Sequence, residues 1–242
     1  GYKIASIYKG ENIFKPKLII SNNHFITKEN YTLLKEKIEN NLEYTIKEAF
    51  KEQTINIKTN NQNLKAIIFS LQENLGIIKI SEVKQFFKSL SPNDLKVLKE
   101  NNIKIGRHFI YYNHSKLNKK NKFIRWILVN LFIKKKNFNT LPNKRIFLNK
   151  NKINDTALSA VGLIRLENFV IDISFLESIS DLFLSEKKEI YHFNFYHIRN
   201  LKIPFSAFYE ILRYFNFRKI VGTNFLTFWK KIEKPFYKQK QY

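Results

Sequence analysis

The chain has 242 residues, 44% of them hydrophobic, and its 23 Phe and 12 Tyr supply enough apolar side chain for a folded core. Lys and Arg number 43 against 20 Asp and Glu, a formal net charge of +23, so the expected partners are polyanions, nucleic acid before an anionic membrane. Cys is absent, which excludes disulfides, Cys-ligated zinc and a thiol nucleophile.

Two features of the composition qualify these inferences. Lys, Asn, Ile, Phe and Tyr are all over-used, as in proteins from AT-rich genomes, so part of the Lys excess follows from codon usage. Met is absent. A piece cut from a longer protein explains that absence simply, and removal of an initiator Met would also explain it.

The N-terminal part is predicted to be a short β segment followed by an array of helices. Strands are expected near residues 4–8 and 17–20, with a turn at 9–12. A long amphipathic helix should then run to about residue 50, because apolar residues recur at helical spacing. The predicted helices begin at Thr27, Asn61, Ser81 and Ser91, where a side-chain oxygen can cap the first turn.

The middle of the chain is predicted to mix strands and helices. Residues 103–112 read as one strand with a bend at Gly106. A basic helix over about 120–134 carries an apolar stripe in which Trp126 is expected to be buried. Further expected elements are a strand at 145–148, a brief helix capped by Asp155 and ending at Gly162, a hairpin around Glu167 and Asn168, and a helix capped by Ser174.

The C-terminal part is predicted to contain two helices and a hairpin. The helices are expected at 197–201 and 205–215, with Asn216 in the left-handed conformation that ends a helix. Two strands follow around Gly222. This order resembles a winged helix-turn-helix.

The expected fold class is therefore mainly α with small β hairpins (α+β), a helical array followed by a winged-helix-like C-terminal module. Four segments are predicted: a short β segment at 1–26 that continues from an upstream domain, the helical array at 27–102, a mixed α/β region with the basic helix at 103–185, and the winged-helix-like module with a basic tail at 186–242.

Catalytic patterns are missing from the sequence. It contains neither a Gly-x-x-x-x-Gly-Lys-[Ser/Thr] phosphate loop nor an Asp-Glu box nor His-Glu-x-x-His. His192 and His197 lack nearby carboxylates for a metal site, and Asp172 with Glu177 is better explained by a strand end and a helix start. We therefore assign no catalytic residue, no metal ligand and no cofactor within the chain.

Single-stranded nucleic acid is usually held by a basic groove together with flat side chains that stack on bases. Tyr111 and Tyr112 are the candidate stacking residues. The candidate cations lie in the strand and basic helix of the middle region and in the C-terminal module, where packing on a neighbouring domain is an equally good explanation. They are Arg107, Lys119, Lys120, Lys122, Arg125, Lys134, Lys135, Lys136, Arg213, Arg218 and Lys219.

Three segments together resemble one family. They are Leu95-Lys-Val-Leu-Lys-Glu-Asn-Asn-Ile-Lys-Ile-Gly-Arg-His-Phe-Ile-Tyr-Tyr112, the stretch from Ala160 to Leu182, and Phe208-Tyr-Glu-Ile-Leu-Arg-Tyr-Phe-Asn-Phe-Arg218. In order and spacing they are similar to the region that follows the motor in alphaproteobacterial ATP-dependent RNA/DNA helicases related to the mitochondrial degradosome helicase. The family usually has Gly where Asn216 stands.

The resemblance implies that this chain and the upstream motor domains have different roles. The chain would be the accessory C-terminal region of a superfamily 2 helicase, packing on the motor domains in cis and helping to enclose single-stranded RNA or DNA. ATP and magnesium would bind in the upstream motor.

Two alternatives stay open, a stand-alone basic nucleic-acid-binding protein and a structural protein–protein interaction module. A peripheral membrane protein ranks well below these two, suggested only by the basic helix around Trp126. No membrane partner is expected. The longest apolar run, 123–133, is interrupted by Arg125 and Asn130 and is too short to cross a bilayer. A bacterial cytoplasmic location is expected.

Overall fold

The computed structural model describes residues 4–21, 27–54, 57, 59–114, 117–133, 141, 144–149, 153–184, 190–193, 195–221 and 227–231. Its elements are helices and small antiparallel sheets, so the mixed α and β character is as predicted. The chain divides into two compact units. One comprises residues 1–143 and 153–163, and the other 144–152 and 164–242. The four segments predicted from the sequence stay a prediction.

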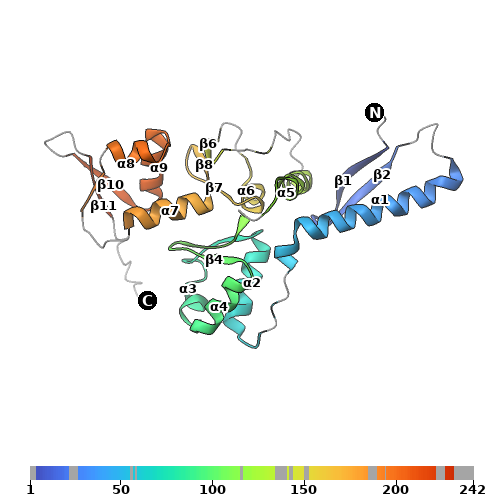
Figure 1. Ribbon diagram of the computed structural model, residues 1–242, viewed down its shortest axis with the longest axis horizontal. Helices are drawn as coiled ribbons and strands as arrows, with labels where there is room; N and C mark the ends of the chain where they lie inside the picture. The colour runs from blue at the N-terminus through green and yellow to red at the C-terminus, as the bar shows by residue number, and fades with distance from the viewer. Residues whose placement is uncertain are drawn as a thin grey trace, which may run out of the picture. The chain divides into compact units, whose positions relative to one another are not determined.

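The N-terminal region is a hairpin beside one long helix. Strands β1 (Ala5–Asn12) and β2 (Lys15–Ile20) pair antiparallel, and the turn between them lies at residues 13–14 rather than at 9–12 as predicted. Helix α1 (Lys28–Ala49) runs alongside the hairpin (Figure 1). Thr27 caps it as predicted, because its hydroxyl accepts a hydrogen bond from the amide of Asn30. A 3-10 turn, η1 (Lys51–Thr54), follows.

The next segment contains three helices and three strands. Helix α2 (Gln62–Glu73) is capped by Asn61, and α4 (Pro92–Glu100) begins with the predicted capping box between Ser91 and Asp94. Strand β3 (Ile77–Lys79) and helix α3 (Lys84–Lys88) lie between these helices. Ser81 does not cap α3, which begins three residues later and has no side-chain cap.

Residues 103–112 form a hairpin instead of one bent strand. Strands β4 (Ile103–Ile105) and β5 (Phe109–Tyr112) pair antiparallel, and β5 also pairs with β3. The bend at Gly106 is therefore a reversal of the chain, closed by a hydrogen bond of 2.8 Å from the Gly106 amide to the carbonyl of Phe109.

A second set of elements follows, with one helix rather than two described between its first strand and its hairpin. Helix α5 (Lys119–Phe132) is the predicted basic helix, and Trp126 is buried within it, as expected. Strand β6 (Ile146–Leu148), helix α6 (Asp155–Ala160) and strands β7 (Leu163–Arg165) and β8 (Phe169–Asp172) come next. Asn154 rather than Asp155 is the N-cap of α6.

The third set completes the described chain. Helix α7 (Ile173–Leu184) is capped by Asp172, whose carboxylate accepts from the amide of Phe175, and not by Ser174. Strand β9 (Ile190–Phe193) was not predicted. Helices α8 (Phe195–Asn200) and α9 (Phe205–Tyr214) and strands β10 (Phe217–Val221) and β11 (Thr227–Lys231) follow.

Three segments of the chain thus share one connectivity. We call 62–112, 119–172 and 173–231 the first, second and third repeats. Each contains a helix, a strand, a further helix and a hairpin, and in each sheet the second hairpin strand is central: the strand orders are β3-β5-β4, β6-β8-β7 and β9-β11-β10. The register of the first two sheets also matches, because the middle residue of the first strand pairs with the second residue of the last strand in both. These pairs are Ile78 with Ile110 and Phe147 with Val170.

The helix that precedes each hairpin ends in the same way. Asn102 (φ 59°), Gly162 (φ 83°) and Asn216 (φ 63°) have left-handed backbones, and each immediately precedes the first hairpin strand. The αL conformation stops a helix and redirects the chain, and Gly and Asn adopt it most easily. The left-handed stop predicted at Asn216 is therefore confirmed, and the same device recurs in all three repeats.

Two of the apolar cores lie in the first compact unit. One is formed by α2, α4 and the β3-β5-β4 sheet, and contains Leu64, Leu71, Leu98 and Ile110. The other joins the end of α1 to α5 through Ile46, Phe50 and Leu128. The repeats are thus anchored by ordinary hydrophobic burial, which leaves the buried polar groups to be explained separately.

Candidate nucleic-acid interface

The candidate cations divide by exposure. Arg107, Lys119, Lys120, Arg213, Arg218 and Lys219 are exposed, and Lys122 is half-buried. Their long side chains can therefore reach a phosphate backbone. Lys134, Lys135 and Lys136 lie outside the described residues.

Tyr111 and Tyr112 do not form a surface on which bases could stack, contrary to the prediction. They belong to β5, the central strand of its sheet, and only 4% and 1% of their surfaces are exposed. Burial raises the pKa of Tyr112 to about 12, because the phenolate would lose its hydration. Both rings are core residues.

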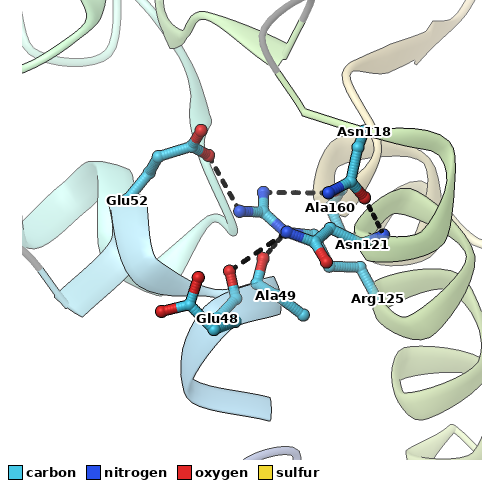
Figure 2. Close-up of polar contacts among 7 residues, drawn as sticks. All are labelled: Glu48, Ala49, Glu52, Asn118, Asn121, Arg125 and Ala160. Carbon is cyan, nitrogen blue, oxygen red and sulfur yellow. Dashed lines mark hydrogen bonds and ion pairs between the residues drawn. The ribbon is translucent and has the colours of Figure 1, made fainter. Parts of the chain in front are cut away.

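Arg125 is also a core residue rather than a phosphate contact, because its side chain is fully buried. Figure 2 shows the guanidinium between three elements. Its Nε donates to the carbonyl of Ala49 at the end of α1, and its Nη1 donates to the carbonyl of Ala160 at the end of α6, at 3.4 Å. Its Nη2 lies 2.8 Å from the carboxylate of Glu52 in η1.

This arrangement satisfies groups that helix geometry leaves without partners. The last carbonyls of an α-helix have no intrahelical donor and carry partial negative charge, so a cation there both donates and neutralises. The amide side chain of Asn121 adds a donor to the Glu48 carbonyl at 3.3 Å (Figure 2). Burial lowers the pKa of Arg125, and the charge of Glu52 opposes that shift. Arg125 and Asn121 thus tie α5 to the end of α1.

His114 lies directly after β5 and is buried. Its ring lies against two glycines: a Cβ on Gly76 would come within 3.3 Å of the ring, and a Cβ on Gly162 within 2.7 Å. Burial, followed by the positive charges of Arg125 and Lys122, lowers the pKa of His114 to about 3. The imidazole is neutral at pH 7.

The lowered pKa of His114 predicts acid lability. Between its ordinary value of 6.5 and about 3, the unfolded chain binds a proton that the folded chain does not, so the free energy of unfolding falls as pH falls through this window. The slope amounts to at most about 1.4 kcal/mol per pH unit. Urea unfolding of the parent and of His114→Gln between pH 6.5 and 4.5 measures it. The variant should show the flatter dependence, and equal slopes would contradict the assignment.

Helix α9 contacts the turn of the preceding hairpin through Glu210. The carboxylate is buried and accepts hydrogen bonds from the amide of Asn168 (2.8 Å), the side chain of Asn168 (2.6 Å) and the amide of Phe169 (3.3 Å). On the same flank Arg213 pairs with Glu167 at 3.2 Å, with both side chains more than 60% exposed. The third repeat is thereby joined to the second.

The Glu210 contact predicts a local effect on amide exchange. Hydrogen bonds to a charged group contribute about 1.5–3 kcal/mol, so Glu210→Ala should speed exchange in residues 166–172 by roughly 10- to 100-fold. Hydrogen–deuterium exchange with mass spectrometry measures this. Glu167→Ala is the matched control, because an exposed ion pair contributes at most about 1 kcal/mol and should change exchange little. Equal effects of the two substitutions would show that the buried carboxylate does not hold the turn.

The outer side of α9 carries residues that the sequence analysis missed. Phe205 is 40% exposed, and its ring centroid lies 4.8 Å from that of Tyr209, one turn later. The Nζ of Lys219 lies 5.7 Å from the centre of the Tyr209 ring. An aromatic pair at i and i+4 that precedes a basic strand is the sequence signal that could have identified them.

Positive charge is distributed unevenly along the chain. Helix α1 contains four Lys and five Glu, whereas residues 195–231 contain seven Lys and Arg against a single Glu. Codon usage alone would raise Lys everywhere, so it does not explain this contrast. Most of the excess of Lys and Arg over Asp and Glu lies in the repeats.

The described residues contain no group of three or more His, Cys, Asp or Glu side chains arranged to hold a metal ion. No helix among them is both long enough and apolar enough to span a membrane.

Comparison with known proteins gave no assignment: no family model, no curated protein and no solved structure matches the chain.

Proposed function

We propose that this chain is a nucleic-acid-binding region built from three tandem repeats of winged-helix type. The supporting observation is the shared connectivity of the repeats: helix, strand, helix and hairpin, with the second hairpin strand central. That is the order of a winged helix, in which the helix before the hairpin enters a groove and the hairpin contacts the backbone. The first and third repeats have two helices between the first strand and the hairpin, α3 with α4 and α8 with α9. The described residues of the second repeat have one, α6.

Charge supports the same function. The exposed cations of α5, α9 and β10 belong to the repeats, whereas α1 is nearly neutral. Lys and Arg that neutralise phosphates release condensed counterions, which makes affinity fall steeply with salt. The residues we expect to contact phosphate are Arg107, Lys119, Lys120, Lys122, Arg218 and Lys219. Arg213 already pairs with Glu167.

The proposal is tested by the affinity for a fluorescein-labelled 20-mer oligonucleotide at several KCl concentrations. We expect log Kd to rise linearly with log salt, with a slope of about 0.7 per phosphate contacted on a single strand. A charge-reversed variant, Lys119→Glu with Lys120→Glu, should lower both affinity and slope, whereas Lys35→Glu with Lys37→Glu on α1 should not. Binding that is absent at 50 mM KCl would contradict the function and favour a structural interaction module.

The resemblance to helicases extends the proposal. The chain would be the accessory C-terminal region of a superfamily 2 ATP-dependent helicase, packing on the motor domains in cis and helping to hold single-stranded RNA or DNA. ATP and magnesium would bind in the motor. Exposed apolar side chains on the N-terminal hairpin and α1 support such a packing role, because a neighbouring domain would remove them from water. They include Tyr8, Phe14, Ile19, Leu33 and Tyr44.

Sequencing the reading frame upstream of the Gly1 codon distinguishes the helicase hypothesis from that of a stand-alone binding protein. A phosphate loop and an Asp-Glu box in that frame would support the accessory role. A start codon immediately before Gly1 would overturn it and leave nucleic-acid binding as the whole proposal.

A further inference from the structure

Helix α9 carries two aromatic rings on its outer side. Phe205 begins the helix, Tyr209 follows one turn later, and their rings are inclined at 56° with centroids 4.8 Å apart. The inward positions are filled by other residues, since Ala207, Phe208 and Ile211 are buried. Phe205 is 40% exposed and Tyr209 is half-buried, so both rings retain surface in contact with water.

The strand after α9 supplies a cation to this pair. Lys219 in β10 extends its Nζ to within 5.7 Å of the Tyr209 ring centre, and Arg218 beside it is exposed. A cation over the face of an aromatic ring is held there by the negative charge of that face. A phosphate contacted by Lys219 would then lie close to the ring.

Another side of α9 is occupied by Glu210, the single acidic residue in 195–231, which holds the turn of the second repeat. No carboxylate of α9 itself therefore lies beside the aromatic pair. Arg213 follows Tyr209 one turn later on the same side of the helix and pairs with the exposed carboxylate of Glu167 at 3.2 Å. The basic group nearest to the rings is therefore Lys219.

We propose that Phe205, Tyr209 and Lys219 form a site for an unpaired base and its phosphate, so that the third repeat binds single-stranded nucleic acid. This inference deepens the proposed function and rests on it. A ring stacks only on a base that has left its own stack, and a single strand offers such bases at little cost. Base edges in a duplex groove are read mainly by Arg, Asn and Gln. The outer side of α9 offers two rings, and the Arg213 that follows them is paired with Glu167.

The test compares alanine variants in fluorescence anisotropy with a labelled dT20 strand. Loss of one base–aromatic stack weakens binding by about 5- to 150-fold, which is the effect expected for Tyr209→Ala. Tyr209→Phe keeps the ring and should bind nearly as the parent does. Tyr44→Ala removes a tyrosine that is 66% exposed on α1 and should leave the affinity unchanged.

A strand of the same length without bases separates stacking from charge. Parent and Tyr209→Ala should bind this abasic strand equally, whereas Lys219→Gln should weaken binding to both strands. If Tyr209→Ala binds dT20 as tightly as the parent does, or loses as much affinity for a 20-bp duplex as for dT20, the base site is overturned while the proposed function stands. If the parent binds neither strand, the proposed function itself fails.

Discussion

Arg125→Ala is expected to lower the free energy of unfolding of the first compact unit by about 3–5 kcal/mol, the range for removing one partner of a buried ion pair. The substitution leaves the Glu52 carboxylate facing the vacated space and deprives the Ala49 and Ala160 carbonyls of their donor. It also removes the guanidinium that lies 5.2 Å from the centre of the Phe50 ring. Repacking cannot restore these polar contacts.

Urea unfolding followed by tryptophan fluorescence measures this effect. The two tryptophans belong to different compact units, so a Trp229→Phe background makes the signal report on Trp126 beside Arg125. Lys120→Ala, on an exposed position of the same helix, is the matched control and should shift stability by less than about 0.5 kcal/mol. An Arg125→Ala protein as stable as this control would show that the buried contacts contribute nothing.

Gly162→Ala is expected to destabilise the fold by about 2–6 kcal/mol, from two causes. The backbone at Gly162 has φ 83°, where a side chain costs about 1–3 kcal/mol. An added Cβ would also lie 2.7 Å from the Cβ and Cγ of His114, and overpacking of a core costs about 1–3 kcal/mol. His114 is buried and cannot move away without opening its surroundings.

Asparagine substitutions separate the two causes. The other two repeats have Asn at the equivalent left-handed position, so Gly162→Asn relieves most of the backbone cost and keeps the clash. It should therefore remain destabilising. Asn216→Gly, the reverse change in the third repeat, should be tolerated. Thermal unfolding measures all three variants, and a stable Gly162→Asn protein would show that His114 does not confine this site.

The elements that follow from local chemistry were predictable from the sequence. Thr27, Asn61 and Ser91 cap the helices assigned to them, because an N-cap depends on one side chain and the first turn. Strands β3 and β9 were not predicted, whereas β6, which has the same place in its sheet, was predicted at 145–148. All three pair with strands that come later in the chain, and this pairing depends on contacts that no local pattern shows.

The candidate site residues also fall into two groups: those whose exposure the sequence predicts and those that tertiary contacts bury. The cations at helix ends and in strand β10 are exposed, as polar patterning suggests. The base-stacking role predicted for Tyr111 and Tyr112 was wrong because two flanking strands make β5 the central strand of its sheet. The phosphate contact predicted for Arg125 was wrong because three separate elements enclose its side chain. One signal was available for Arg125: it interrupts an otherwise apolar run, where a charged residue is often a buried hydrogen-bonding group.

Lysine reactivity in the presence of nucleic acid tests the central claim most directly. Acetylation of the protein, alone and with a single-stranded 20-mer, followed by mass spectrometry of the peptides, reports which amines become protected. We predict protection at Lys119, Lys120 and Lys219 in the repeats and unchanged reactivity at Lys35, Lys37 and Lys47 on α1. Protection confined to α1, or equal along the whole chain, would contradict the claim that the tandem repeats form the nucleic-acid interface.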